Sequence, residues 1–251
     1  MTTIVSGSGL LGARAIELSR RNPGSVLGAI LFPLLFFALF NIVLRRIMDA
    51  RDFDYVQLLP STIVVQAMLF AGMSSAYYVA SDRLSGVSDR LRSLPIGRAA
   101  PAIGRALGDL TRAAVSLFVV LAVGVAVGMR FDAGLVWVPV FVGVGLAFAL
   151  AISLGMGLIG QVASSPEGAV SIASIPYLPL IMLSTGFAPV EDFPDWLEPF
   201  VRNQPVAVVI DALRALAGDG DIGSTVPAAL LWSAGLSVVF IAIRVRVESP
   251  R

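Results

Sequence analysis

The sequence predicts an all-α membrane protein with six transmembrane helices. Of its 251 residues, 57% are hydrophobic and only 14% are charged, and the mean hydropathy is +0.86. Soluble domains carry about 25% charged residues, so the composition excludes that class. Six uncharged stretches approach or exceed the ~17–25 residues that a helix needs to cross a bilayer. They are Asn22–Leu44, Tyr55–Ser81, Ala113–Met129, Ala133–Pro166, Gly168–Val190 and Ile222–Ile243.

The predicted spans cover about residues 25–44, 56–80, 110–129, 135–160, 169–187 and 224–243, within a single domain of residues 1–251. The third stretch is short, but flanking arginines can reach the two interfaces. A five-span alternative follows if the chain does not turn back around Glu167. Before the first span, leucines alternate with Arg14, Glu17 and Arg20 over about residues 8–22, which predicts an amphipathic helix on the inner membrane surface.

The distribution of arginine predicts the orientation. With six spans, both termini and the loops after helices two and four share one side, which collects twelve arginines against six on the other side. Because positively charged loops stay in the cytoplasm, both termini are expected to be cytoplasmic.

An acidic segment, Glu191–Asp221, lies between the last two spans on the predicted outer side. A helix is expected from Pro205 to just before Gly218, because proline favours the first turn and glycine the end of a helix. Its apolar residues repeat at helical spacing. We therefore expect an external segment that re-enters the membrane or lies along its surface, with a structural lid as the simpler interpretation.

Absent residue types exclude several functions. The chain has no Lys, His or Cys, so it lacks a Walker A lysine, the usual metal ligands and thiol nucleophiles. No catalytic residue, cofactor or metal site is expected. No ionisable residue is expected inside a span, which argues against proton- or sodium-coupled transport. The near-balanced charge gives no sign of nucleic-acid binding.

The basic segment Asp82–Arg112 contains a second signal on the predicted cytoplasmic side. Ser88 is a suitable cap for a short helix that Pro95 ends. Such a helix can dock into a groove on a cytoplasmic partner. The simpler interpretation is a basic loop that only sets the topology.

Two patterns make the chain resemble the membrane subunit of bacterial type-2 ABC exporters of the daunorubicin-resistance type. The cytoplasmic segment resembles the E-R-x-x-G…R-L-x-x-L-P-x-x-R motif, with Asp82 in place of the usual Glu. The outer segment resembles the family pattern through Ser184-Thr185-Gly186, Pro189, Phe193-Pro194, Trp196-Leu197, Pro199-Phe200, Gln204-Pro205 and Asp211-Ala212-Leu213-Arg214.

This resemblance implies a transport subunit of the bacterial inner membrane that exports hydrophobic or amphipathic drugs, antibiotics or lipids. It implies a second permease subunit, identical or related, and two separate ATPase subunits that bind ATP and Mg²⁺. The residues expected to couple to the ATPase are Asp82, Arg83, Gly86, Asp89, Arg90, Leu91, Leu94, Pro95 and Arg98. The residues expected along the substrate pathway, within the surrounding membrane lipids, are Asn41, Gln66, Met68, Phe70, Met73, Tyr177, Met182 and Ser184.

Two other functions remain open from the residues alone. One is an integral membrane enzyme that modifies lipids, and the other is an assembly factor without transport activity. An ATPase reading frame beside this one would favour the exporter.

Overall fold

The computed structural model describes residues 31–43, 55–87, 100–218 and 220–248. These residues form helices joined by turns, with no strand among them, which confirms the all-α class. After a helix at Leu31–Val43, the elements are α3 (Tyr55–Leu84), α5 (Ala100–Val127), η1 (Leu135–Trp137), α6 (Val138–Val162), α7 (Pro166–Ser174), α8 (Tyr177–Met182), η2 (Val190–Asp192), α9 (Glu198–Asn203), α10 (Pro205–Ala217) and α11 (Ile222–Glu248).

Four stretches of the described helices are long and apolar enough to cross a membrane: Gln57–Leu84, Ala102–Val127, Leu135–Val162 and Ile222–Arg246. The apolar helix Leu31–Val43 is shorter, and it covers part of the first predicted span. The predicted amphipathic helix over residues 8–22 lies outside the described residues.

The fifth predicted span, 169–187, is two short helices rather than one. α7 ends at Ser174 and α8 begins at Tyr177, with Ile175 and Pro176 forming a turn between them. Pro176 lacks a backbone N–H and cannot donate the hydrogen bond that would continue α7, which explains the break. The length of the uncharged stretch alone did not reveal it.

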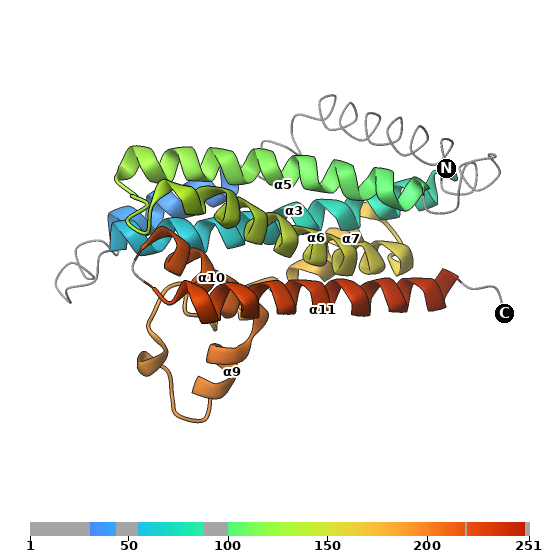
Figure 1. Cartoon of the computed structure of the whole chain (residues 1–251). Coiled ribbons are helices and arrows are strands. Elements are labelled where there is room, and N and C mark those ends of the chain that lie inside the picture. Colours follow the sequence, from blue (N-terminus) through green and yellow to red (C-terminus); the bar gives the residue numbers. More distant parts are fainter. Residues whose placement is uncertain (1–30, 44–54, 88–99, 219, 249–251) are drawn as a thin grey trace.

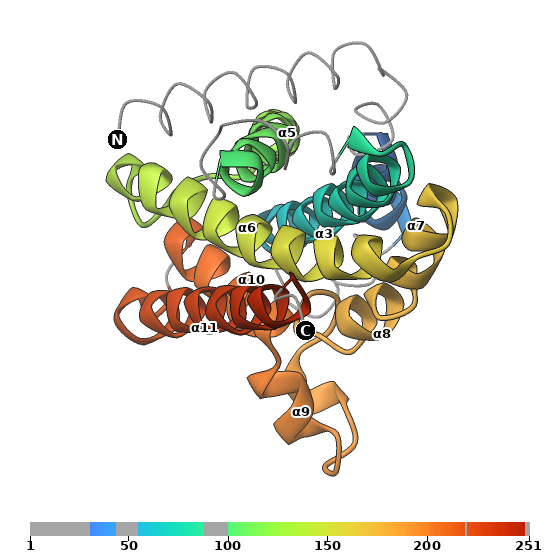
Figure 2. The same cartoon turned by 90° about the vertical axis from the view of Figure 1, so that its right-hand side faces the viewer.

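The long helices form a layered bundle around α3 and α6. Figures 1 and 2 show α5 on one side of this pair and α10 with α11 on the other, while α9 projects away from the bundle. Of the most apolar stretch of α3, 78% is buried inside the bundle, whereas of the corresponding stretch of α11 only 17% is buried. α3 is therefore the central helix, and α11 presents most of its surface to the surroundings.

The ends of several helices follow from their sequences. At α7, Ser165 accepts a hydrogen bond from the backbone N–H of Gly168 at 2.9 Å, and Pro166 occupies the first turn. The side chain of Asp221, just before α11, accepts from Ser224 at 2.6 Å and from the N–H of Gly223. These hydrogen bonds lower the pKa of the Asp221 carboxyl. As predicted, α10 starts at Pro205 and buries a continuous stripe. That stripe is Val206, Val209, Ile210, Leu213 and Leu216.

Asp109 and Arg112 form a charged pair inside the bundle. α5 begins at Ala100, so the predicted third span, 110–129, is the later part of a longer helix. Both charged residues are buried, and they pair with each other one turn apart. Ser75 of α3 donates to Asp109 at 2.8 Å, and the Arg112 guanidinium lies 4.6 Å from the ring centroid of Tyr78. Mutual pairing makes this burial tolerable.

Glycine allows the central helices to approach closely. A Cβ on Gly160 of α6 would lie 2.5 Å from the carbonyl oxygen of Ala76 in α3, and 2.9 Å from the Cβ of Val79. Such small residues are typical of helix contacts within membranes. Gly143 of the same helix would meet no atom within 4 Å.

Gly160→Ala should therefore destabilise the chain by about 1–3 kcal/mol, because the helix backbones must separate. The matched variant Gly143→Ala should leave stability unchanged or slightly raised. Tryptophan-fluorescence melting of the purified chain in detergent measures both. Equal melting temperatures for the two variants would contradict the close contact of α3 with α6.

Arg112→Met should cost about 3–5 kcal/mol, because it leaves the Asp109 carboxylate buried without its cation. Removing both charges, in Asp109→Leu with Arg112→Met, should restore most of that loss. Arg202→Met removes one partner of the exposed ion pair with Glu198, and it should cost at most about 1 kcal/mol of stability. Melting curves distinguish these cases, and a double variant as unstable as the single one would refute the pairing argument.

Candidate functional site

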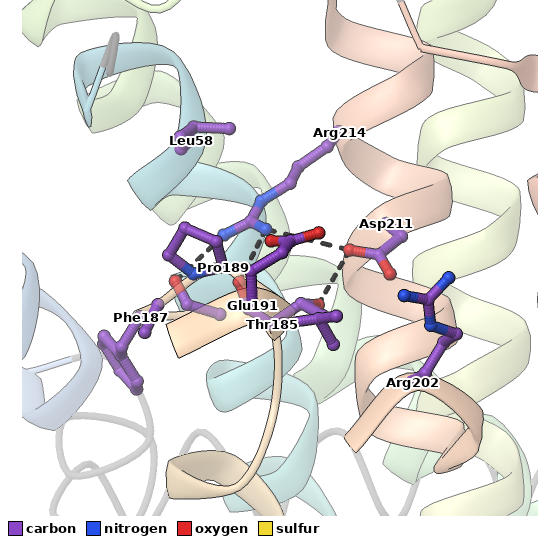
Figure 3. Close-up of a pocket in the computed structure, with 11 residues that line it drawn as sticks. Leu58, Thr185, Phe187, Pro189, Glu191, Arg202, Asp211 and Arg214 are labelled. Carbon is purple, nitrogen blue, oxygen red and sulfur yellow. Dashed lines mark hydrogen bonds and ion pairs between the residues drawn. The ribbon is translucent and has the colours of Figure 1, made fainter. Parts of the chain in front are cut away.

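A cavity of about 340 Å³ lies among the start of α3, the segment after α8, α9 and α10 (Figure 3). Its wall combines apolar side chains with four charged ones. The lining residues are Leu58, Thr185, Gly186, Phe187, Ala188, Pro189, Val190, Glu191, Arg202, Asp211 and Arg214.

Arg214 of α10 holds the segment after α8 in place. Its Nη1 donates to the carbonyl oxygen of Thr185 at 2.6 Å, and its Nη2 donates to that of Gly186 at 2.9 Å. The same Nη2 lies 3.3 Å from the hydroxyl of Thr62 in α3, which itself donates to the Gly186 carbonyl at 2.9 Å. One guanidinium therefore joins three parts of the fold.

Asp211 lies one turn before Arg214 on α10 and shares its contacts. The Thr185 hydroxyl donates to Asp211 Oδ1 at 2.7 Å, and Arg214 Nη1 lies 3.7 Å from the same oxygen (Figure 3). Burial raises the pKa of the Asp211 carboxyl, against the opposing effects of the Thr185 hydrogen bond and of Arg214. The Thr185 hydrogen bond and Arg214 therefore offset only part of the cost of burying this carboxylate.

These contacts explain why the two halves of the outer sequence pattern occur together. Ser184, Thr185 and Gly186 end the α8 segment, and the Asp211–Arg214 turn of α10 bonds directly to it. Gln204, at the start of α10, donates to the carbonyl oxygen of Leu183. The residues of this sequence pattern thus attach the segment after α8 to α10.

At the opposite end of the bundle, the first predicted coupling residues contact their own chain. Asp82 lies 3.9 Å from Arg105 of α5, and Arg83 donates to the carbonyl oxygen of Ala163 at the end of α6. Gly86 has a φ of 71°, which favours glycine. These three residues fix where the loop leaves α3. The remaining predicted coupling residues, Asp89, Arg90, Leu91, Leu94, Pro95 and Arg98, lie outside the described residues.

The predicted pathway residues differ widely in exposure. Gln66 and Tyr177 are joined by a buried hydrogen bond of 2.5 Å between α3 and α8. Asn41 and Phe70 are half-buried, while Met182 is 41% exposed. The other three, Met68, Met73 and Ser184, are buried.

An aromatic band, which the sequence reasoning only partly found, passes through Phe70 and Tyr177. Their rings lie 4.9 Å apart, and Phe70 also contacts Phe32 at 4.8 Å. From Phe32 the contacts continue along one helix face to Phe40, which stacks on Phe187 at the cavity. In the sequence, the four-residue spacing of Phe32, Phe36 and Phe40 already indicates that these rings share one helix face. Nothing local in the sequence marked Phe187.

The described residues contain no group of three or more His, Cys, Asp or Glu placed to hold a metal ion. What the cavity offers is binding, through an apolar wall and a few charged groups. Glu191 and Arg202 at this cavity, and Arg105 at the other end, were not singled out from the sequence because their roles depend on distant segments.

Comparison with known proteins gives the family. Residues 9–217 match the ABC-2 type transporter family. The chain is 34% identical over 227 residues to a probable doxorubicin resistance ABC transporter permease protein, DrrC, of Mycobacterium tuberculosis, covering 86% of this chain and 78% of that protein. It is 29% identical over 244 residues to the daunorubicin resistance ABC transporter permease protein DrrB1 of Streptomyces coeruleorubidus, covering 93% and 83%.

One family assignment follows from the fold and from the extent of these matches. The family match covers most of the chain, including α3 to α10, and apolar helices long enough to cross a membrane make up the bundle. The chain belongs to the ABC-2 type transporter family and is an integral membrane permease.

Proposed function

We propose that this chain is the membrane-spanning subunit of an ATP-driven exporter for hydrophobic or amphipathic molecules such as drugs, antibiotics or lipids. Two separate ATPase subunits bind ATP and Mg²⁺ and supply the energy, and a second permease subunit, identical or related, completes the complex. The observation that carries this proposal is the extended similarity to two permeases whose names record resistance to doxorubicin and daunorubicin.

The proposed topology has six spans with both termini in the cytoplasm of a bacterial cell. In Figure 1 the ends of α3, α6 and α11 and the start of α5 lie at one end of the bundle. The excess of arginine in the segments that join this end supports its placement in the cytoplasm. The outer cavity, α9 and α10 then belong to the external side, and α7 with α8 forms a broken fifth crossing.

The proposed contact with the ATPase is the loop that leaves α3 after Gly86. Its start is held to α5 by Asp82 and to α6 by Arg83, so a force applied to the loop reaches three helices. Leu94 is suited to an apolar groove, and Arg90 and Arg98 to acidic groups around it.

The proposed substrate pathway follows the aromatic band between helix Leu31–Val43, α3 and α8. Aromatic and methionine side chains give an adaptable apolar surface. The buried pair Gln66 and Tyr177 adds a polar contact beside Phe70. In this proposal the surrounding residues Asn41, Met68, Met73, Met182 and Ser184 shape the route.

Leu94→Asp should abolish substrate-stimulated ATP hydrolysis in a complex co-expressed with the proposed ATPase subunit, while insertion persists. The physical reason is that a carboxylate cannot enter an apolar groove without a large desolvation cost. Trp196→Asp places a carboxylate at an exposed position outside the candidate spans and should leave stimulation intact. Normal stimulation and complex formation in Leu94→Asp would reduce the loop to a topology signal.

Labelling of single cysteines tests the orientation, because the chain has no native cysteine. Asp195→Cys, exposed in the outer segment, should react with an impermeant maleimide in intact cells. Ser85→Cys, exposed at the other end, should react only after the membrane is opened. A cysteine at Gly220, near the end of the same segment, would be unsuitable, because its Cβ would lie 2.7 Å from Ala215 Cα. The reverse labelling pattern would overturn the proposed orientation.

A further inference from the structure

We propose that α9 and the turn before it anchor the chain in the membrane interface, with Trp196 and Phe200 inserted among the lipid headgroups. The partner of this surface is therefore the bilayer itself rather than another protein. Only the choice of the outer leaflet rests on the proposed function, because that choice follows from the proposed orientation. The contact with lipid does not depend on which molecule is exported.

Trp196 and Phe200 form an exposed aromatic pair. The backbone N–H of Leu197 donates to the carbonyl oxygen of Pro194 at 2.8 Å, so the helical turn starts before α9. Residues four apart in a helix lie on one face. Trp196 is 79% exposed and Phe200 is 49% exposed, whereas Val201 is buried. This segment thus buries Val201 within the chain and presents both rings to the surroundings.

α9 projects sideways from the bundle rather than beyond its end. In Figure 1 it lies level with the first turns of α11. Figure 2 shows it outside the side of the bundle that α8 and α11 form. The first turns of α11 belong to the stretch Ile222–Arg246, which is long and apolar enough to cross a membrane. A segment that projects sideways near the end of such a helix lies in the interfacial layer, where tryptophan is enriched.

The backbone of the segment suits a layer in which water is scarce. Pro194 and Pro199 have no N–H group that would need a partner. The side-chain amide of Asn203 donates to the carbonyl oxygen of Pro199 at 2.8 Å, and the N–H of Gln204 donates to that of Phe200 at 3.0 Å. Because these groups are bonded within the segment, its entry into a membrane is less costly.

Charge argues against a second copy of the same segment as the partner. Between residues 191 and 203 the charged side chains are four acids and one arginine, namely Glu191, Asp192, Asp195, Glu198 and Arg202. A symmetric contact would bring this acidic surface against itself, and like charges that face each other repel. In the membrane interface, by contrast, charged side chains extend into water while the rings stay among the headgroups. A lipid surface therefore accommodates both kinds of side chain.

The test reads the fluorescence of Trp196 in the full chain, reconstituted in phosphatidylcholine nanodiscs. Trp137→Phe with Trp232→Phe leaves Trp196 as the only tryptophan. Lipid brominated close to the headgroup should quench Trp196 at least about twofold, and more than lipid brominated near the chain end. The matched control keeps only Trp232, which lies within the candidate span of α11 and should be quenched more by the deeper bromine. Stronger quenching of Trp196 by the deeper bromine, by aqueous iodide or by no reagent would overturn the proposal, because the ring would then lie in hydrocarbon, in water or against protein.

Phe200→Asp tests the second ring in the same single-tryptophan chain. A carboxylate is costly at this depth, so quenching of Trp196 by the shallow bromine should fall at least about twofold. Arg202→Asp changes the charge by more, but its position two residues later lies on the opposite helix face and should leave the quenching unchanged. Equal effects of both variants, or no effect of Phe200→Asp, would contradict the insertion of the ring. If the tryptophan replacements prevent folding, Trp196→Phe in the otherwise unchanged chain should remove the same quenched component, and an unchanged signal there contradicts the anchor equally.

Failure of the anchor and failure of the proposed function give different results. The proposed coupling lies at the opposite end of the bundle, so Trp196→Asp should end the lipid contact without ending stimulated ATP hydrolysis. A Trp196 shielded from lipid in a chain that stimulates its ATPase normally would overturn the anchor and leave the proposed function in place. Shallow quenching in a chain with the reverse cysteine-labelling pattern would support the anchor and overturn only the proposed orientation.

Discussion

Carbonyl oxygens at the ends of broken helices set the main constraint on this fold. Inside a membrane bundle, a backbone group that leaves a helix must find a partner within the protein. α8 ends within the bundle, and Arg214 and Gln204 donate to the carbonyl oxygens of Leu183, Thr185 and Gly186 that follow it. At the other end of the bundle, Arg83 does the same for Ala163 after α6. Long side chains from distant helices thus satisfy the backbone where α8 and α6 end.

This constraint links the two ends of the molecule. The residues that donate to these carbonyl oxygens belong to the two sequence patterns that resemble the transporter family: Arg83 to the first, Gln204 and Arg214 to the second. Their positions are fixed against α3, the most buried helix, and against α6. Close contact at Gly160 and the paired charges of Asp109 and Arg112 add to the rigidity of that centre. The segment after α8, by contrast, lines the cavity.

Sequence reasoning was reliable where a signal is local. The proline and glycine at the ends of α10, together with its apolar spacing, predicted that helix and its buried face. The buried charged pair within α5 was not found from the sequence. Asp109 and Arg112 neutralise each other and receive Ser75 and Tyr78 from another helix, which no local pattern shows. The outer cavity was out of reach for the same reason, since Glu191, Arg202 and Asp211 meet only after the chain has folded.

The aromatic band has a mechanical consequence. Its rings meet at tilted, edge-on and stacked angles rather than in one fixed geometry. Aromatic pairs are stable in offset and edge-to-face arrangements alike, so one geometry can replace another at little cost. A small shift of helix Leu31–Val43 against Phe70 and Phe187 would therefore cost little in ring contacts, because one favourable ring geometry would replace another.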